Sequence, residues 1–221
     1  MHTYASDSID RKVAPFGIAA FAVLAAIGCS ILLSHLAPSV PWWVKQPTVM
    51  MLYGFGHLLY DRFIWRSLIG GLRLSQIPDC GGTWYGEIRS SHNGGTQTEG
   101  MIHVHQTWSK ICVAFESASS RSFSRMAALN VTPDATEGLV YEYTNEPRGD
   151  AVPTMQAHPG FATHRMSPDG QTMEVDYYTG RGRETHGTMR LRRLCRERLS
   201  RDEAARRYAE MRQGREVMKT A

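Results

Sequence analysis

The sequence predicts an N-terminal two-helix transmembrane hairpin followed by an all-β domain, and two observations support this fold class. The first 70 of the 221 residues contain two apolar segments, residues 13–36 and about 47–69. Residues 79–194 then form eight short runs in which polar and apolar side chains alternate. Alternation with a period of two is typical of β-strands, and no helical pattern of useful length interrupts the series.

The first apolar segment is long enough to cross a bilayer. Residues 13–36 contain no charged side chain, only His35 near the end. At about 1.5 Å per residue, this length covers a hydrocarbon core of roughly 30 Å. The segment exceeds the apolar region of a secretory signal peptide, and no small-residue cleavage site follows it. We therefore expect a transmembrane helix.

The second apolar segment is weaker. Residues 48–60 are apolar apart from His57, but Asp61, Arg62 and Arg66 interrupt the continuation. Two interpretations stay open: a second spanning helix, or an amphipathic helix that lies on the membrane or on the β domain. Spanning is favoured because Asp61 and Arg62 can lie side by side at the interface. A hairpin returns the chain to the side where it began.

The basic residues predict which side that is. Five of them flank the apolar segments outside the connecting loop, and the loop carries only Lys45; the five are Arg11, Lys12, Arg62, Arg66 and Arg73. Because positive charge is retained in the cytoplasm, both termini and the β domain should be cytoplasmic. The four cysteines agree with this compartment, since their spacing predicts neither a disulfide framework nor a metal site.

The net charge of +4 conceals an uneven distribution. Residues 1–75 carry a net charge of +3 and residues 190–221 a net charge of +6. Residues 76–189 hold 8 basic and 13 acidic side chains, which is a net charge of −5. Proteins that bind DNA or RNA usually present a basic surface. The acidic β domain therefore argues against a nucleic-acid polymer as partner.

The alternating runs predict eight strands. They are Thr83–Arg89, Met101–Gln106, Lys110–Glu116, Ser122–Ala128, Gly138–Asn145, Gly160–Met166, Thr172–Thr179 and Thr185–Leu194. Turn signals separate them, and Pro168-Asp169-Gly170 is the clearest, because proline presets φ and glycine adopts positive φ. Such a series predicts an up-and-down barrel or a sandwich. An eight-stranded barrel is just wide enough to enclose one small ligand.

The alternation also predicts which side chains point inward. Charged residues such as Glu142, Glu174 and Asp176 mark the outer faces. The interior is then aromatic and polar: Trp84, Gln106, Tyr141, Tyr143, Asn145, Tyr177 and Thr179. An unpaired buried polar group costs about 1–3 kcal/mol, so a pocket for a flat polar ligand such as a nucleobase is favoured. The alternative is a plain core whose tyrosine hydroxyls reach water at the barrel mouth.

Several short motifs follow one another in a distinctive order. They are Gly82-Thr83-Trp84-Tyr85-Gly86, Val104-His105-Gln106-Thr107-Trp108, a serine-rich run at 119–124, Tyr141-Glu142-Tyr143-Thr144-Asn145-Glu146-Pro147, His158-Pro159-Gly160 and Asp176-Tyr177-Tyr178-Thr179-Gly180-Arg181. Together with the hairpin, this order resembles the two-transmembrane β-barrel effectors of bacterial cyclic-oligonucleotide-based antiphage signalling systems (CBASS). The resemblance covers about residues 13–194.

The resemblance implies an antiphage defence effector with a lipocalin-like barrel. Such a barrel binds a cyclic dinucleotide made by a partner nucleotidyltransferase (CD-NTase) during phage infection. Binding drives homo-oligomerisation, and the transmembrane segments disrupt the bacterial inner membrane and kill the infected cell. The ligand-binding residues that we carry over are Trp84, Gln106, Tyr141, Tyr143, Asn145, Tyr177, Thr179 and Arg181.

The two phosphates of such a ligand meet a domain of net negative charge. Local cations would have to focus the field, and the candidates are Arg121, Arg125, Arg181 and Arg183. Hydroxyl groups could add donors to the phosphate oxygens from Ser119, Ser120, Ser122 and Ser124. The alternative for these arginines is solvated surface charge.

The sequence indicates a binding protein without catalytic activity, metal or cofactor. It contains neither a Gly-x-Ser-x-Gly nucleophile elbow nor a Gly-x-x-x-x-Gly-Lys phosphate loop. His103 and His105 could lie on one strand face, but no third ligand falls at a matching position nearby. Serine, histidine and aspartate are present without a spacing that assembles them.

We therefore expect four parts: a cytoplasmic N-terminus (1–12), the hairpin (13–70), the ligand-binding barrel (76–194), and a basic tail (195–221) that is helical or disordered and could meet anionic lipids. A second class of function stays open. A membrane-anchored, lipocalin-like carrier or sensor would hold a lipid or another small apolar ligand. The polar interior favours the effector.

Overall fold

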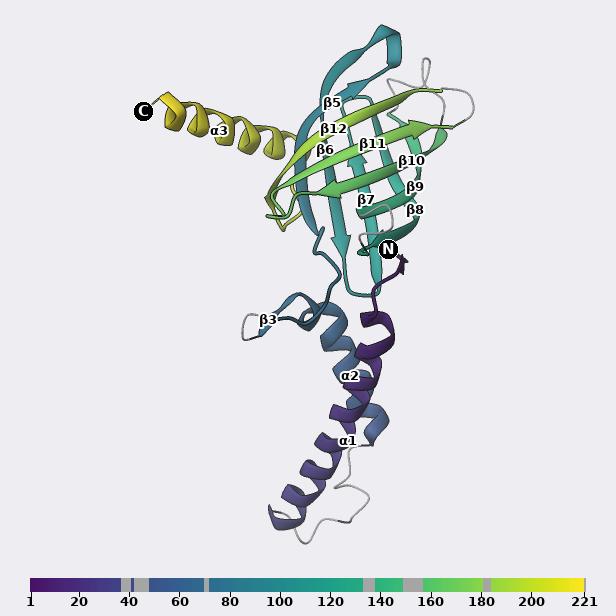
Figure 1. Cartoon of the computed structure of the whole chain (residues 1–221), viewed down its shortest axis with the longest axis vertical. Helices are drawn as coiled ribbons and strands as arrows, with labels where there is room; N and C mark the ends of the chain where they lie inside the picture. The colour runs from purple at the N-terminus through teal and green to yellow at the C-terminus, as the bar shows by residue number, and fades with distance from the viewer. Residues whose placement is uncertain are drawn as a thin grey trace. The chain divides into compact units, whose positions relative to one another are not determined.

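The computed structural model describes residues 1–36, 41, 48–69, 72–132, 138–148, 157–180 and 184–220. It divides the chain into two compact units. One consists of residues 8–78, and the other joins residues 1–7 to residues 79–221. The first unit is mainly helical and the second contains the long strands (Figure 1).

The first apolar segment forms a long helix, α1 (Asp10–Leu36), as predicted. Its 27 residues extend roughly 40 Å, and it is the one helix among the described residues that is long and apolar enough to cross a membrane. Asp10 lies in the first turn, where a negative charge interacts favourably with the helix dipole. The hydroxyl of Ser8 accepts a hydrogen bond from the Asp10 amide at 3.3 Å.

The second helix, α2 (Val49–Arg62), is shorter than the predicted segment 47–69. Thr48 caps its start, since the Thr48 Oγ1 atom accepts from the Met51 amide at 3.2 Å. Its 14 residues extend about 21 Å, less than the bilayer core, so a second spanning helix is not clearly shown. The polar pair Asp61-Arg62 ends the helix, and the short elements η1 (Ile64–Arg66), β3 (Leu68–Ile69) and β4 (Leu72–Arg73) follow.

Small residues bring α1 and α2 together. Ala22 of α1 is 1% exposed, and a Cβ atom at Gly56 of α2 would lie 3.2 Å from Ile18 Cγ2. Close approach of this kind is how apolar helices pack when side chains at the contact are small. The loop residues 37–40 and 42–47, on which the predicted hairpin turn falls, lie outside the described residues.

All eight predicted strands are present. They are β5 (Gly82–Ser90), β6 (Thr96–Gln106), β7 (Lys110–Glu116), β8 (Ser120–Asn130), β9 (Gly138–Pro147), β10 (His158–Met166), β11 (Thr172–Thr179) and β12 (His186–Cys195). Each pairs antiparallel with its neighbour in sequence, and β12 pairs with β5 from Gly187↔Ser90 to Cys195↔Thr83. The sheet is therefore a closed up-and-down barrel, and the sandwich alternative is wrong (Figure 1).

One seam of the barrel is paired over only a short distance. Strands β7 and β8 pair directly at three positions, from Ala114↔Phe123 to Glu116↔Arg121. Residues 1–7, which we call the N-terminal strap, continue the sheet beyond these pairs. In the strap, β1 (His2–Thr3) pairs antiparallel with β7, and β2 (Ala5–Ser6) lies parallel to β8.

Polar contacts hold the strap on the barrel. Tyr4 is 7% exposed, and its hydroxyl donates to the Trp108 carbonyl at 2.8 Å. The Asp7 carboxylate accepts from the amides of Val131 and Thr132 at 2.8 and 3.0 Å, and these hydrogen bonds lower the pKa of Asp7. The predicted N-terminal segment 1–12 thus has two parts, because its first seven residues belong to the barrel unit.

The tail forms a helix, α3 (Arg201–Thr220). The helical alternative of the prediction is therefore correct. Its first turns pack on the outside of β5 and β6, where Leu199 and Ala204 are buried with Tyr85 and Met101. The ring of Tyr208 lies 5.3 Å from the ring of Tyr85.

Candidate ligand-binding site

The barrel encloses a cavity of about 320 Å³ to which every strand contributes. Its lining residues are Ile88, Ser90, His92, Thr96, Thr98, Phe115, Ser117, Ser119, Ser120, Ser122, Tyr141, Tyr143, Asn145, His158, Ala162, Tyr177, Thr179, Thr185 and Met189. A volume of about 300–1,000 Å³ is usual for small-molecule sites. The cavity is therefore large enough for a small ligand, and its lining is rich in hydrogen-bonding groups.

Three tyrosines form the aromatic part of the lining: Tyr141, Tyr143 and Tyr177. The rings of Tyr141 and Tyr143 are 6.1 Å apart and inclined at 54°. Glycines on neighbouring strands make room for two of these rings. A Cβ atom at Gly160 would lie 2.2 Å from Tyr143 Cζ, and one at Gly187 would lie 2.6 Å from Tyr177 Oη.

Four serines at the β7–β8 turn form a hydroxyl-rich wall: Ser117, Ser119, Ser120 and Ser122. The Ser117 Oγ atom organises this turn, because it accepts from the amides of Ser119 and Ser120 at 3.3 and 3.1 Å. Ser124 also faces inward but belongs elsewhere. Its Oγ atom accepts from the Val113 amide at 2.9 Å and lies 2.8 Å from His2 Nε2 of the strap.

Beyond Tyr143 on the same strand, an amide and an imidazole lie on the adjacent strands β9 and β10. Asn145 and His158 are partners in the β9–β10 register, and both are buried. Thr179 and Thr185 lie at the β11–β12 connection, with their Oγ1 atoms 3.0 Å apart. Each of these four residues lines the cavity. They offer the donors and acceptors of an amide, an imidazole and two hydroxyl groups.

At the cavity floor, Tyr141 forms a hydrogen bond with a buried histidine. The Tyr141 Oη atom lies 2.9 Å from His164 Nε2, and His164 is 1% exposed. Desolvation lowers the pKa of His164 to about 3, so the imidazole is neutral at physiological pH. Desolvation and the neighbouring Tyr143 raise the pKa of Tyr141, so the phenol keeps its proton.

The described lining contains no lysine, arginine, aspartate or glutamate. Of the four arginines considered for phosphate binding, Arg121 and Arg125 are exposed, and Arg121 forms an ion pair with Glu146 at 3.6 Å. For these two, the structure agrees with solvated surface charge. Arg181 and Arg183 lie outside the described residues.

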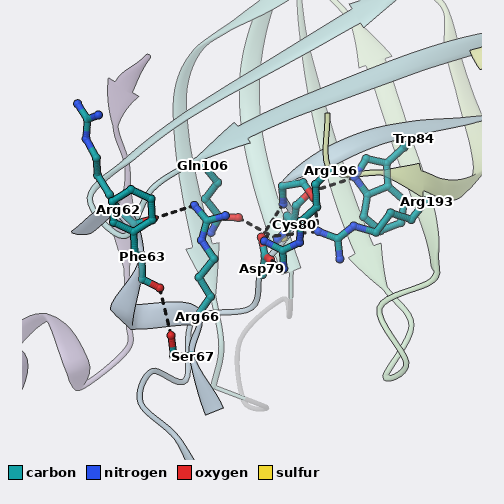
Figure 2. Close-up of polar contacts among 11 residues, drawn as sticks. Arg62, Phe63, Arg66, Ser67, Asp79, Cys80, Trp84, Gln106, Arg193 and Arg196 are labelled. Carbon is teal, nitrogen blue, oxygen red and sulfur yellow. Dashed lines mark hydrogen bonds and ion pairs between the residues drawn. The ribbon is translucent and has the colours of Figure 1, made fainter. Parts of the chain in front are cut away.

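The structure brings together five of the eight residues that the sequence assigned to ligand binding: Tyr141, Tyr143, Asn145, Tyr177 and Thr179. Trp84 and Gln106 are also inward-facing and buried, but they do not line the cavity. Figure 2 shows them around Cys80. The Trp84 indole donates to the Cys80 carbonyl at 3.0 Å, and Gln106 Oε1 accepts from the Cys80 amide at 2.8 Å.

A cation completes the surroundings of Trp84. The guanidinium of Arg193 lies 5.3 Å from the Trp84 ring and 3.7 Å from an Asp79 oxygen, and Arg196 also pairs with Asp79 (Figure 2). These contacts join β5 to β12 and hold the chain where it enters the barrel. Trp84 and Gln106 therefore have structural partners, and their role as ligand contacts stays a prediction.

Sequence reasoning missed several lining residues, of which Phe115, His158 and Thr185 are examples. His158 was omitted because its strand was predicted to begin at Gly160, two residues late. Extending the alternation back from Gly160 would have placed His158 inside. Thr185 begins the predicted strand 185–194 and shares parity with Met189 and Leu191, so applying the alternation to that strand would have placed it inside.

Among the described residues, no group of three or more histidine, cysteine, aspartate or glutamate side chains could hold a metal ion. His103 has a different partner, because its Nδ1 atom lies 3.0 Å from Thr83 Oγ1. Burial and the nearby Arg198 and His105 lower the pKa of His103.

A closed eight-stranded barrel with one polar and aromatic cavity defines a small-molecule receptor barrel. The chain belongs to the family described as "Cap15, cyclic dinucleotide receptor domain", whose family model matches residues 75–193, more than half of the chain. This confirms the resemblance to CBASS barrel effectors that the motifs indicated.

Two curated relatives share the name "CD-NTase-associated protein 15". The protein from Yersinia aleksiciae is 29% identical over 162 residues, which cover 73% of this chain and 75% of the relative. The protein from Escherichia albertii is 26% identical over 131 residues, which cover 51% of this chain and 68% of the relative.

Proposed function

We propose that this protein is a membrane-acting CBASS effector whose barrel binds a cyclic dinucleotide in the cavity described above. Bound ligand promotes homo-oligomers, and the assembled apolar helices disrupt the inner membrane. The observation that carries the proposal is the polar and aromatic cavity inside a barrel of the cyclic dinucleotide receptor family. The protein acts by binding and association, without a catalytic step.

The cavity suits a nucleobase better than an apolar ligand. Its volume of about 320 Å³ is at the lower end of the range usual for small-molecule sites, which favours entry of part of a cyclic dinucleotide over entry of the whole ligand. Tyr143 and Tyr177 offer ring faces, and each base–aromatic stack contributes about 1–3 kcal/mol. The hydroxyl, amide and imidazole groups of the lining favour a ligand with hydrogen-bonding groups over the lipid tail of the carrier alternative.

The size of the cavity also implies that only part of the ligand lies inside it. One base enters between the tyrosines, and the phosphates and second nucleotide lie nearer the opening, beside the serine turn. Ser119 offers a neutral hydroxyl donor there, whereas the Ser117 hydroxyl already donates to the Ser120 carbonyl. A neutral donor does not offset the net charge of −5 of residues 76–189, so it stabilises phosphate through the hydrogen bond alone.

The strap supports a direct connection between the barrel and the membrane. Its last residue, Asp7, is bound to the barrel, and α1 begins three residues later at Asp10. We propose that both termini are cytoplasmic, as the distribution of basic residues predicts. Gly17 and Gly28 of α1 have open space around them, which leaves small-residue surface for contact with other copies.

The binding step is tested with the full chain in detergent. Isothermal titration calorimetry with cyclic di-AMP, cyclic di-GMP and cyclic di-UMP should show saturable binding of at least one of them. Tyr143→Ala should weaken that binding about 5- to 150-fold, as expected for loss of one base stack. Absence of binding by all members of a panel that also includes mixed-base and 2′,5′-linked forms would reject the proposal.

The output step is tested separately in cells and vesicles. A periplasm-dependent reporter fused after Ala221 should stay inactive if the C-terminus is cytoplasmic. The reconstituted chain should release a trapped dye from anionic vesicles when its cyclic dinucleotide is added. Ligand binding without dye release would agree with the receptor function and contradict the proposed membrane disruption.

A further inference from the structure

The hydrogen bond between Tyr141 and His164 restricts what the cavity floor can accept. Tyr141 lines the cavity, whereas His164 is outside the lining. The two rings meet edge to face at 80°, with centroids 4.9 Å apart, and the Oη–Nε2 distance is 2.9 Å. His164 therefore does not contact a candidate ligand itself and can influence it only through the Tyr141 hydroxyl.

The histidine carries a single ring proton. Burial lowers the pKa of His164 to about 3, so the ring is neutral at physiological pH. A neutral imidazole has one N–H donor and one acceptor nitrogen. Its Nδ1 atom is buried and has no hydrogen-bond partner among the described residues.

Two tautomers of the His164 imidazole are consistent with these positions, and they differ in which buried group lacks a hydrogen-bond partner. If Nδ1 carries the proton, a buried N–H group is left without an acceptor. If Nε2 carries it, the donor without a protein acceptor is the Tyr141 hydroxyl instead, and Tyr141 lines the cavity, where water or a ligand can accept its proton. Orphaned buried N–H groups are rare in proteins, whereas under-used acceptors are tolerated more often. The second tautomer is favoured, and in it His164 Nε2–H donates to Tyr141 Oη.

The consequence concerns the tyrosine. Once Oη accepts from His164, its own proton must point to another acceptor, and no second hydrogen-bond partner of Tyr141 lies among the described residues. We propose that His164 is a positioning residue that holds the Tyr141 hydroxyl as a donor towards the ligand, so that the cavity floor selects a hydrogen-bond acceptor. A ring nitrogen or a carbonyl oxygen of a nucleobase supplies such an acceptor. The identity of the ligand rests on the proposed function.

The selection works mainly by rejecting the wrong group. A ligand that placed an N–H at this point would face another donor, and two buried donors would be left unpaired. A site built to form a specific hydrogen bond discriminates strongly against ligands that cannot form it, because its own polar group loses its partner.

The first test needs no ligand. Long-range ¹H–¹⁵N NMR of the full chain in detergent, labelled in histidine, should show His164 with its proton on Nε2 and a neutral ring from pH 7 to pH 5. His164→Gln identifies the signal by its disappearance. A proton on Nδ1, or a ring that becomes charged in this range, overturns the proposal.

The second test is a double-mutant cycle in affinity, using whichever of cyclic di-AMP, cyclic di-GMP and cyclic di-UMP binds the wild type most tightly. His164→Phe should weaken binding about 5- to 10-fold, the value of one neutral hydrogen bond. His164→Gln keeps an N–H donor and should stay within about 2-fold of wild type. In a Tyr141→Phe background, His164→Phe should have no further effect beyond about 2-fold.

The outcomes separate the two proposals. If the losses from His164→Phe and Tyr141→Phe multiply, His164 does not act through the hydroxyl and the positioning role is wrong. If no cyclic dinucleotide binds the wild type but the Nε2 tautomer is found, the proposed function fails and the donor assignment of Tyr141 stands. Near-ultraviolet circular dichroism of each variant shows that the barrel is folded.

Discussion

Gly160→Ala should obstruct the candidate cavity by displacing Tyr143. A Cβ atom at position 160 would lie 2.2 Å from Tyr143 Cζ and 2.3 Å from its Oη atom. The three nearest atoms all belong to the Tyr143 side chain, so the strand backbone can stay in place. The ring must move, and the open direction is into the cavity that it lines.

The magnitude follows from two effects. Overpacking by one methyl group costs about 1–3 kcal/mol, which lowers Tm by about 2–12 °C in a chain of this size. A displaced ring also loses its stack with the base, worth about 1–3 kcal/mol, so affinity should fall about 5- to 150-fold. Binding is therefore affected at temperatures where the variant is still folded.

Calorimetry of the full chain with its cyclic dinucleotide measures the effect, and Thr163→Ala is the matched control. Thr163 lies on the same strand, β10, with its side chain on the outer face, and it does not line the cavity. This variant should bind as the wild type does. In a Tyr143→Ala background, Gly160→Ala should cost nothing further, because the clashing ring is absent.

Wild-type affinity in folded Gly160→Ala would refute the reasoning. It would mean that Tyr143 moves without consequence and is not part of the ligand site. Equal losses in the single variant and in the Tyr143→Ala background would point instead to a general distortion of β10.

Three further predictions concern the strap, the buried histidine and the membrane helix. Tyr4→Phe should lower barrel stability by about 1 kcal/mol through loss of the 2.8 Å hydrogen bond to Trp108, and Tyr4→Ala by about 3–5 kcal/mol. The exposed control Thr3→Ala should have little effect. Intrinsic tryptophan fluorescence during heating measures the Tm of each variant, and equal values for the three would show that the strap does not stabilise the barrel. His164 has a folded-state pKa of about 3, below the unfolded value of about 6.5, so the unfolded state binds more protons between these values. Stability should therefore fall as pH falls through this range, by on the order of 1 kcal/mol per pH unit. Urea titrations at pH 7 and pH 5 should show this loss in the wild type and a smaller one in His164→Gln, and identical pH dependence would contradict the assignment. Gly17→Leu and Gly28→Leu on the open surface of α1 should reduce vesicle leakage while leaving ligand affinity unchanged, and Phe16→Leu is the control on the same exposed helix. Full leakage in both glycine variants would remove this surface from the mechanism.

The strands were predictable because each has a charged residue that marks its outer face. Glu142 in β9 and Asp176 in β11 determine which alternate positions are buried, and the observed burial follows this alternation. Burial is determined within each strand, since a shift of the strand register by one residue would expose all of its apolar side chains to solvent. The long apolar helix was predictable for the same reason, because length and composition are properties of the segment itself.

The strap was not predictable from its own residues. A seven-residue segment with one tyrosine shows no period, and its partners are more than 100 residues away, at Trp108 and Val131. Only closure of the barrel creates a seam between β7 and β8 where such a segment can pair. The end of α2 at Arg62 was indicated in part, because Asp61, Arg62 and Arg66 interrupt the apolar segment, although the predicted segment extended to residue 69.

The candidate binding site was also predictable only in part. The sequence by itself determined which residues face the interior, and Trp84, Gln106, Tyr141 and Tyr143 are all buried there. It could not determine their depth along the barrel, because alternation distinguishes two faces and contains no information on height. The stagger of eight strands placed Tyr143 beside Gly160 at the cavity and Trp84 beside Cys80 in a packed region. Tertiary structure alone decided which inward-facing side chains line the cavity, because that depends on how distant strands are aligned.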